Sequence, residues 1–153
     1  LMVRGDVFPL KDADPKQLDA ILIPGGMGCV TVLSSLKRDG TEAQVLPDVR
    51  EILAGMFARD KPIGGIGYGA ALVAFALRAR VQPIITIGDD AQMVELLKTV
   101  GADVIKVQPH EVVFDKENKI FSTSGTSPNA SLYRASLGIE VMVSNMLKCK
   151  ARK

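Results

Sequence analysis

The sequence contains few of the residues that build disulfide scaffolds or metal centres. Of its 153 residues only two are cysteines, Cys29 and Cys149, and His110 is the only histidine. Two cysteines make neither a disulfide framework nor a metal-type spacing, and one histidine rules out a histidine-rich zinc site. We therefore expect no metal and no cofactor, and a reducing compartment or the mitochondrial matrix in place of secretion.

Long apolar runs and a strong charge imbalance are also missing. The longest apolar runs fall far below the roughly 20 residues of a membrane-spanning helix, and the front of the chain shows no signal-peptide pattern. The net charge is +2, and we interpret the basic residues of 148–153 as a solvated tail. These features predict no membrane insertion and no nucleic-acid partner. The composition, 47% apolar and 24% charged, is that of one ordinary globular domain over residues 1–153.

Strand and helix patterns alternate along most of the sequence. Short apolar runs closed by turn residues predict buried parallel strands at 18–23, 62–66, 83–87 and 104–107. Helical periodicity predicts helices at 47–59, 70–78, 91–100 and 129–148. A β-hairpin is expected where 112–114 and 120–122 flank a charged turn. This order predicts an α/β fold, a three-layer sandwich around a mostly parallel sheet with a late hairpin.

Two of the predicted helices carry more specific expectations. Asp89 or Asp90 is expected to cap the helix at 91–100, and Gly101 to end it. The last helix shows one apolar face, formed by Leu132, Ala135, Ile139, Met142, Val143 and Met146.

The stretch 61–72 has three interpretations. A short apolar strand runs through alternating glycines directly into an apolar helix, and Gly65 to Ala70 matches G-x-G-x-x-A with Asp89 about twenty residues later. That pattern is typical of dinucleotide binding. The same corner is typical of a nucleophile elbow, in which Gly67 stands where the reactive side chain would be. A tight packing turn is the third interpretation, and the pattern alone leaves all three open.

Other small and polar residues are expected near this corner. Pro24-Gly25-Gly26 ends a different strand at the same edge of the sheet, where freed amides could form an oxyanion or carboxylate cradle or simply a turn. The hydroxyl-rich loop at 122–127 could contribute polar groups. The predicted pocket consists of Gly25, Gly26, Gly67, Tyr68 and Ser124.

Cys29 and His110 are the remaining candidates for chemistry. Cys29 could be a reactive thiol if it lies near a helix N-terminus, which lowers a thiol pKa, but no sequence-near base supports it and a packing role is the commoner alternative. His110 stands between Pro109 and Glu111, and we interpret it as a loop residue.

Four segments carry a family resemblance. They are LDAILIPGGMG at 18–28, KPIG at 61–64, TIGDD at 86–90 and VVFDKENKI at 112–120. In this order they resemble the DJ-1/PfpI superfamily of class I glutamine-amidotransferase-like domains, and within it the ES1/ElbB branch. The resemblance implies a flavodoxin-like sandwich, often dimeric, with weak glyoxalase- or deglycase-type activity on reactive carbonyls. It also implies a mitochondrial matrix location in eukaryotes and a cytoplasmic one in bacteria.

The sequence departs from this family where the chemistry should be. The position of the family's elbow cysteine is Gly67, and the Ile-Ala-Pro that follows it is Tyr68-Gly69-Ala70. The family's later Pro-Ala-Tyr segment is Ser124-Gly125-Thr126. The resemblance enters at about Leu1, so it implies that the first strand–helix–strand portion of the domain, which carries an acidic partner of the cysteine, is absent from this sequence.

The resemblance and its departures together predict a catalytically degenerate domain. Because a thiol mechanism cannot survive loss of the thiol, we expect a structural or binding subunit, leaning away from enzymatic activity. The expected partners are other protein chains, in a homo-oligomer or a larger assembly that is mitochondrial in a eukaryote. One alternative is a weak glyoxalase- or deglycase-type enzyme or small-molecule binder, and another is nucleotide binding at Gly65 to Ala70.

Overall fold

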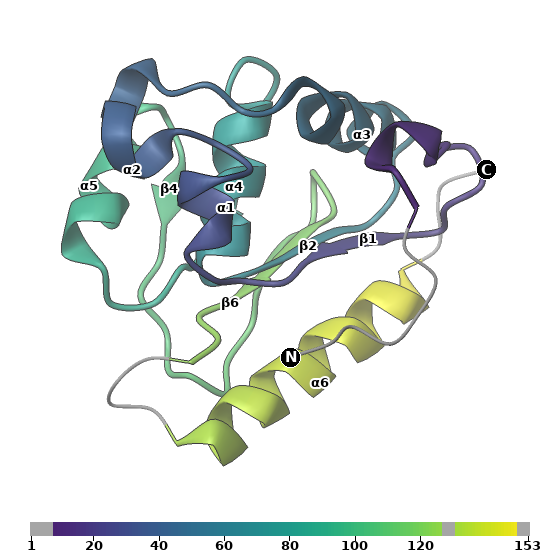
Figure 1. Ribbon diagram of the computed structural model, residues 1–153. Helices are drawn as coiled ribbons and strands as arrows, with labels where there is room; N and C mark the ends of the chain where they lie inside the picture. Colours follow the sequence, from purple (N-terminus) through teal and green to yellow (C-terminus); the bar gives the residue numbers. More distant parts are fainter. Residues whose placement is uncertain (1–7, 127–130, 150–153) are drawn as a thin grey trace.

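The computed structural model describes residues 8–126 and 131–149 (Figure 1). Its strands are β1 (Ile21–Ile23), β2 (Ile63–Ile66), β3 (Ile84–Ile85), β4 (Asp103–Val104), β5 (Val113–Asp115) and β6 (Ile120–Thr123). Its α-helices are α1 (Gly28–Thr31), α2 (Leu36–Asp39), α3 (Pro47–Ala58), α4 (Tyr68–Leu77), α5 (Ala91–Thr99) and α6 (Leu132–Lys148). Two 3₁₀ turns are η1 (Leu10–Asp12) and η2 (Gly40–Glu42).

The main sheet has the strand order β1-β2-β6-β5. β1 and β6 both run parallel to β2, so that Ile63 pairs with Ile21 on one side and Ile120 on the other. β5 and β6 form the expected antiparallel hairpin. β3 and β4 form a separate parallel pair, joined to β6 by a 2.9 Å bond from the Thr86 N–H to the Ser122 hydroxyl. The prediction of an α/β fold with a mostly parallel sheet and a late hairpin is confirmed.

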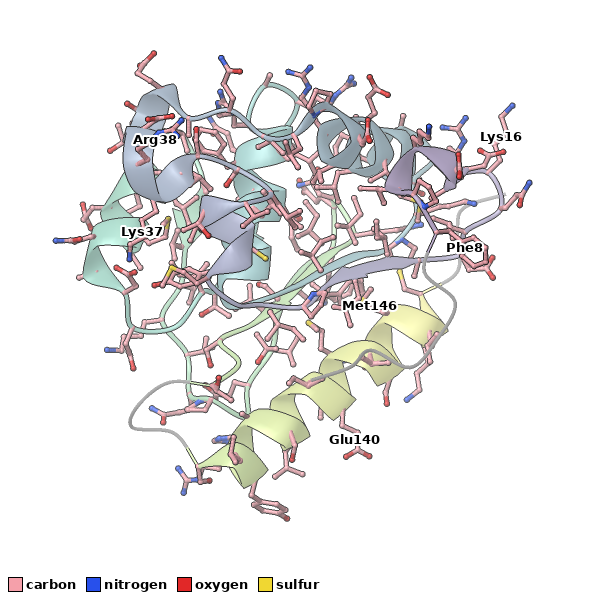
Figure 2. The ribbon with its side chains drawn as sticks, in the orientation of Figure 1. Phe8, Lys16, Lys37, Arg38, Glu140 and Met146 are labelled. Atoms are coloured by element: carbon pink, nitrogen blue, oxygen red, sulfur yellow. The ribbon has the colours of Figure 1, made fainter. Side chains whose placement is uncertain are left out.

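Helices cover the main sheet on both faces (Figure 1). α4 contacts β1 and β2, and α3 packs on β2 and on α4, while α6 packs on β2 and β6 from the opposite face. In Figure 2, Met146 of α6 points toward the sheet and Glu140 points away from it. A Cβ on Gly64 would lie only 2.5 Å from the Met146 sulfur, so this glycine allows α6 to approach β2 closely.

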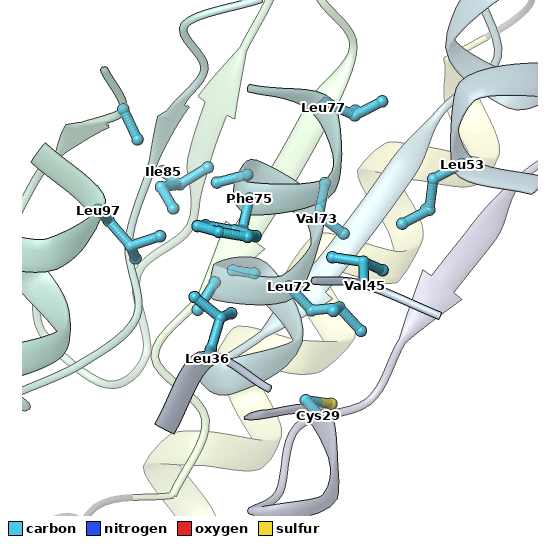
Figure 3. Close-up of a cluster of buried hydrophobic side chains, with 14 of the residues drawn as sticks. Cys29, Leu36, Val45, Leu53, Leu72, Val73, Phe75, Leu77, Ile85 and Leu97 are labelled. Carbon is cyan, nitrogen blue, oxygen red and sulfur yellow. The ribbon is translucent and has the colours of Figure 1, made fainter. Parts of the chain in front are cut away.

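The core is centred on α4, which is buried on nearly every side as its composition predicts (Figure 3). Each large apolar side chain buried here contributes roughly 1.5–3 kcal/mol relative to exposure. The α3 stripe also packs into this core, since its apolar residues recur at the predicted spacing. Fully buried members contributed by four elements are Leu36, Leu53, Leu72, Phe75, Leu77 and Leu97.

Several predicted boundaries are wrong. β1 lacks residues 18–20, and β3 contains only two of the five residues predicted at 83–87. The strand predicted at 104–107 is Asp103–Val104, and α4 begins two residues early, at Tyr68. Leu132 is 76% exposed and does not belong to the buried face of α6. The helix start predicted at Asn129 lies outside the described residues.

Candidate functional site

The corner between β2 and α4 has the backbone geometry of an elbow. Gly67 lies between the two elements with φ 52° and ψ −120°. Its N–H donates to the Thr123 carbonyl at 2.8 Å, and its own carbonyl accepts from the N–H groups of Ala70 at 3.0 Å and Ala71 at 3.3 Å. A side chain on such a backbone costs of order 1–3 kcal/mol, and it is held so only where the surroundings enforce it. The chain therefore keeps the turn of an elbow and presents no reactive atom there.

The other glycines at this corner permit close packing. A Cβ on Gly65 would lie 2.5 Å from the Ala70 nitrogen, and one on Gly69 would overlap the Ile23 carbonyl oxygen. A Cβ on Gly25 would overlap the Ile66 carbonyl oxygen, so the Pro24-Gly25-Gly26 loop lies directly against the elbow. Packing thus accounts for the glycine spacing without a pyrophosphate. The elbow and the tight turn are two aspects of one structure.

A cavity of about 730 Å³ opens at this elbow. The loops after β1, β2, β3 and β6 supply most of its lining, in accord with the rule that ligand crevices form outside the carboxyl ends of parallel strands. Part of its wall is apolar, formed by Met27, Ile66, Ile87 and Ile139. The five residues of the predicted pocket, Gly25, Gly26, Gly67, Tyr68 and Ser124, all line it.

Unpaired polar groups surround the elbow. Within the described residues, the N–H groups of Gly25, Gly26 and Tyr68 have no hydrogen-bond acceptor. Ser124 also lines the cavity, and its hydroxyl is buried with no partner in the part of the chain that the structure describes. A buried hydroxyl without a partner costs about 1–3 kcal/mol, so water or a ligand is the usual explanation. The free N–H groups are suited to donate hydrogen bonds to an anionic or carbonyl oxygen.

Tyr68 and Asp90 form a short hydrogen bond across the cavity wall. The Tyr68 hydroxyl donates to Asp90 Oδ2 at 2.6 Å, while Oδ1 accepts from the Met93 N–H at 3.0 Å and caps α5. The bond to Asp90, with burial, raises the pKa of Tyr68 to about 12. The Tyr68 hydroxyl, then the Met93 amide, lower the pKa of Asp90. Asp90 is therefore the N-cap, and its link to Tyr68 is the feature of the site that sequence reasoning missed.

Cys29 lies beside the cavity loop but does not line the cavity. Its side chain is buried in the core (Figure 3), and its thiol donates to the Pro24 carbonyl at 3.4 Å. Burial raises the pKa of the Cys29 thiol, which keeps it protonated at neutral pH. This environment favours the packing role over a reactive thiol.

His110 and Asp89 are the remaining candidates. His110 lies in the turn before β5 and does not line the cavity. Asp89 does line it, but its carboxylate pairs with Lys106 at 2.8 Å. Across residues 8–126 and 131–149, no three histidine, cysteine or acidic side chains are grouped as metal ligands. None of the described helices is both long and apolar enough to cross a membrane.

Comparison with known proteins agrees with this architecture. No family model matches the chain. The mitochondrial ES1 protein of Danio rerio is 30% identical in an alignment of 128 residues that covers 74% of this chain and 46% of that protein. The chain thus spans about half the length of that relative.

Two solved structures have related folds. An isoprenoid biosynthesis protein with an amidotransferase-like domain from Ehrlichia chaffeensis superposes with a TM-score of 0.80 at 29% identity, over 91% of this chain and 63% of that one. The rapid encystment protein of 24 kDa from Francisella tularensis has a TM-score of 0.56 at 16% identity, over 90% of this chain and 62% of that one. The latter similarity is one of fold alone.

The fold combines a mostly parallel sheet, an elbow between β2 and the buried helix α4, and a cavity beside that elbow. It is that of an amidotransferase-like domain of flavodoxin type. Sequence and structural similarity agree on the particular branch. Both similarities support the ES1/ElbB-like class within the DJ-1/PfpI superfamily.

Proposed function

We propose that this chain is a catalytically silent ES1/ElbB-like domain whose elbow cavity binds a small molecule through a carbonyl or carboxylate oxygen. The observation that carries the proposal is Gly67: it has the elbow conformation, with φ 52° and ψ −120°, and no side chain. The free N–H groups around it support binding, because they can donate hydrogen bonds to a ligand oxygen without any covalent step. Activity on reactive carbonyls through the family's thiol would require a side chain that is absent here.

No other group near the elbow replaces the missing thiol. Cys29 is buried, its pKa is raised, and its sulfur is turned to the Pro24 carbonyl. Tyr68 has a pKa raised to about 12, so it remains protonated at neutral pH. These features favour a binding domain over the alternative of a weak glyoxalase- or deglycase-type enzyme. Nucleotide binding at Gly65 to Ala70 is the least supported alternative, since packing accounts for those glycines.

Restoring the thiol tests the proposal. We expect the unmodified protein to consume methylglyoxal no faster than buffer, and Gly67→Cys to gain a thiol that reacts with a thiol reagent well before Cys29 does. Gly67→Ala is the matched control, because it adds the same backbone strain without sulfur. Ready turnover of dicarbonyls by the unmodified protein would show that the domain is not silent.

A second role, as a structural subunit, is favoured by the edge of the sheet. β1 is the last strand of the sheet within the described residues, and its three residues, Ile21 to Ile23, are only partly buried. An unpaired apolar edge is a ready site for a strand from another chain. We propose partner chains at this edge, in a homo-oligomer or a larger assembly, and a mitochondrial location if the organism is a eukaryote. Sedimentation at tens of micromolar tests it, since a stable monomer would count against this role.

A further inference from the structure

Tyr68 is the second departure from the family pattern, directly after Gly67. The family resemblance implies isoleucine at this position, and an isoleucine side chain cannot donate a hydrogen bond. Here the Tyr68 hydroxyl lies 2.6 Å from Asp90 Oδ2, and both residues line the elbow cavity. Two adjacent positions of this chain thus present no nucleophile, at Gly67, and a hydrogen-bond donor, at Tyr68.

The Tyr68 hydroxyl donates to the Asp90 carboxylate, a negative charge that the proposed ligand must approach. The proposed ligand presents an anionic or carbonyl oxygen, and Asp90 places a carboxylate in the wall of the same cavity. Asp89 has its own counter-charge in Lys106. Asp90 has no ion pair within the described part of the chain, although Lys37 of α2 (Figure 2) attracts it at longer range. The Tyr68 hydroxyl donates to one Asp90 oxygen and the Met93 N–H to the other, and the backbone N–H of Gln92 further lowers the pKa of this carboxyl.

We propose that Tyr68 determines the charge selectivity of the elbow cavity, by holding the Asp90 carboxylate so that the elbow N–H groups can donate to an anionic oxygen. This inference rests on the proposed function. Without the hydroxyl, Asp90 Oδ2 loses its donor and presents unshielded negative charge to the cavity, where like charges repel. Tyr68 is in this sense a positioning residue that acts through Asp90.

The test compares a charged probe with a neutral probe of the same shape. Acetate and acetamide are titrated into isotope-labelled protein, and the amide chemical shifts of Gly25 and Gly26, which line the cavity, report its occupancy. We expect Tyr68→Phe to weaken acetate binding by about fivefold, the size of the repulsion between two charges about 4 Å apart in water, and to leave acetamide binding unchanged. The phenyl ring keeps the shape of the wall, so the change isolates the hydroxyl.

Removing the charge should reverse the effect. In Tyr68→Phe combined with Asp90→Asn, acetate should bind as tightly as in the unmodified protein, because the repelling carboxylate is gone. Equal weakening of acetate and acetamide by Tyr68→Phe, or no recovery in the double variant, overturns the inference and leaves the cavity as a binding site. If neither probe shifts these amides in the unmodified protein, the proposed function itself fails, and this inference fails with it.

Discussion

Gly69 of α4 lies directly against Ile23 of β1, so closely that a Cβ on the glycine would overlap the Ile23 carbonyl oxygen. This contact sets how tightly the elbow helix packs on the sheet. We expect Gly69→Ala to lower the free energy of unfolding by about 1–3 kcal/mol, because neither the backbone of β1 nor that of α4 can move aside cheaply. Urea denaturation followed by circular dichroism measures the change.

Gly28→Ala is the matched control for this substitution. A Cβ there would meet nothing within 4 Å, and Gly28 begins a helix, where alanine is favoured. Its stability should stay within about 0.5 kcal/mol of the unmodified protein. Equal losses for the two variants would mean that backbone entropy, and not the contact with Ile23, explains the need for glycine.

Asp115 connects the hairpin to β3. Its buried carboxylate accepts hydrogen bonds from the Ile84 N–H at 3.0 Å, the Asn118 N–H at 3.1 Å and the Asn118 side-chain amide at 2.9 Å. Asp115→Ala should cost about 2–3 kcal/mol of stability, since it leaves donors near β3 without an acceptor. Thermal melting with calorimetry gives the value.

Asn118→Ala separates the turn from the link to β3. It removes only the side-chain amide bond, so the expected loss is about 0.5–1.5 kcal/mol. If this variant were as unstable as Asp115→Ala, the importance of Asp115 would lie in the hairpin turn alone.

The Tyr68–Asp90 bond should give a distinctive titration. The pKa of Tyr68 is raised to about 12 in the folded protein, so its contribution to stability is complete below about pH 10, the ordinary tyrosine pKa, and is lost between about pH 10 and 12. Near-ultraviolet absorbance of a Tyr133→Phe variant follows Tyr68 alone. Asp90→Asn should move the ionisation of Tyr68 to lower pH, and an unmoved titration would assign the shift to burial.

At acidic pH the free energy of unfolding depends on Asp90, whose pKa is lowered by the Tyr68 hydroxyl and the Met93 amide. A lowered carboxyl pKa contributes stability above its unfolded value of about 4, and this contribution is lost as the pH falls through the lowered pKa. The stability difference between the unmodified protein and Tyr68→Phe should therefore be constant from about pH 5 to 9 and narrow at both extremes.

Local patterns predicted the helices and the hairpin well. The α3 stripe depends only on the spacing of apolar residues over two helical turns, and Asp90 and Gly101 mark the two ends of α5 by their own side-chain and backbone preferences. The wrong strand boundaries have a tertiary cause. β3 pairs only with β4 by a regular ladder and is joined to β6 by the Ser122 side chain, so its apolar run is longer than its strand.

The site was predictable in position but not in its contacts. The rule that strand ends meet at one edge of the sheet places Gly25, Gly67 and Ser124 together, and these residues do share a cavity. Tyr68 and Asp90 are 22 residues apart in the sequence. Each is explained by a local role, Tyr68 as part of the cavity wall and Asp90 as the N-cap of α5. Their hydrogen bond depends on how α4 and α5 are placed relative to each other, which no spacing in the sequence reveals.

Gly67 and Gly40 have nearly the same backbone conformation. Comparing alanine variants at the two positions therefore distinguishes the effect of backbone strain from an effect on the cavity. Gly40 has φ 56° and ψ −124°, against φ 52° and ψ −120° for Gly67. A Cβ on Gly40 would make an ordinary 3.7 Å contact, whereas one on Gly67 would lie 3.1 Å from the Ser124 carbonyl oxygen. We expect each alanine variant to lose about 1–3 kcal/mol of stability, with Gly67→Ala the larger loss because of the added contact.

Only Gly67→Ala should also change the cavity, since Gly40 does not line it. Acetate titration of both variants, read from the amide shifts of Gly25 and Gly26, should show weakened binding for Gly67→Ala and unchanged binding for Gly40→Ala. A stable Gly40→Ala beside a strongly destabilised Gly67→Ala would place the cost in the contact with Ser124. In that case the elbow itself would be unstrained, and glycine would be needed at position 67 to let the loop at Ser124 pack against it.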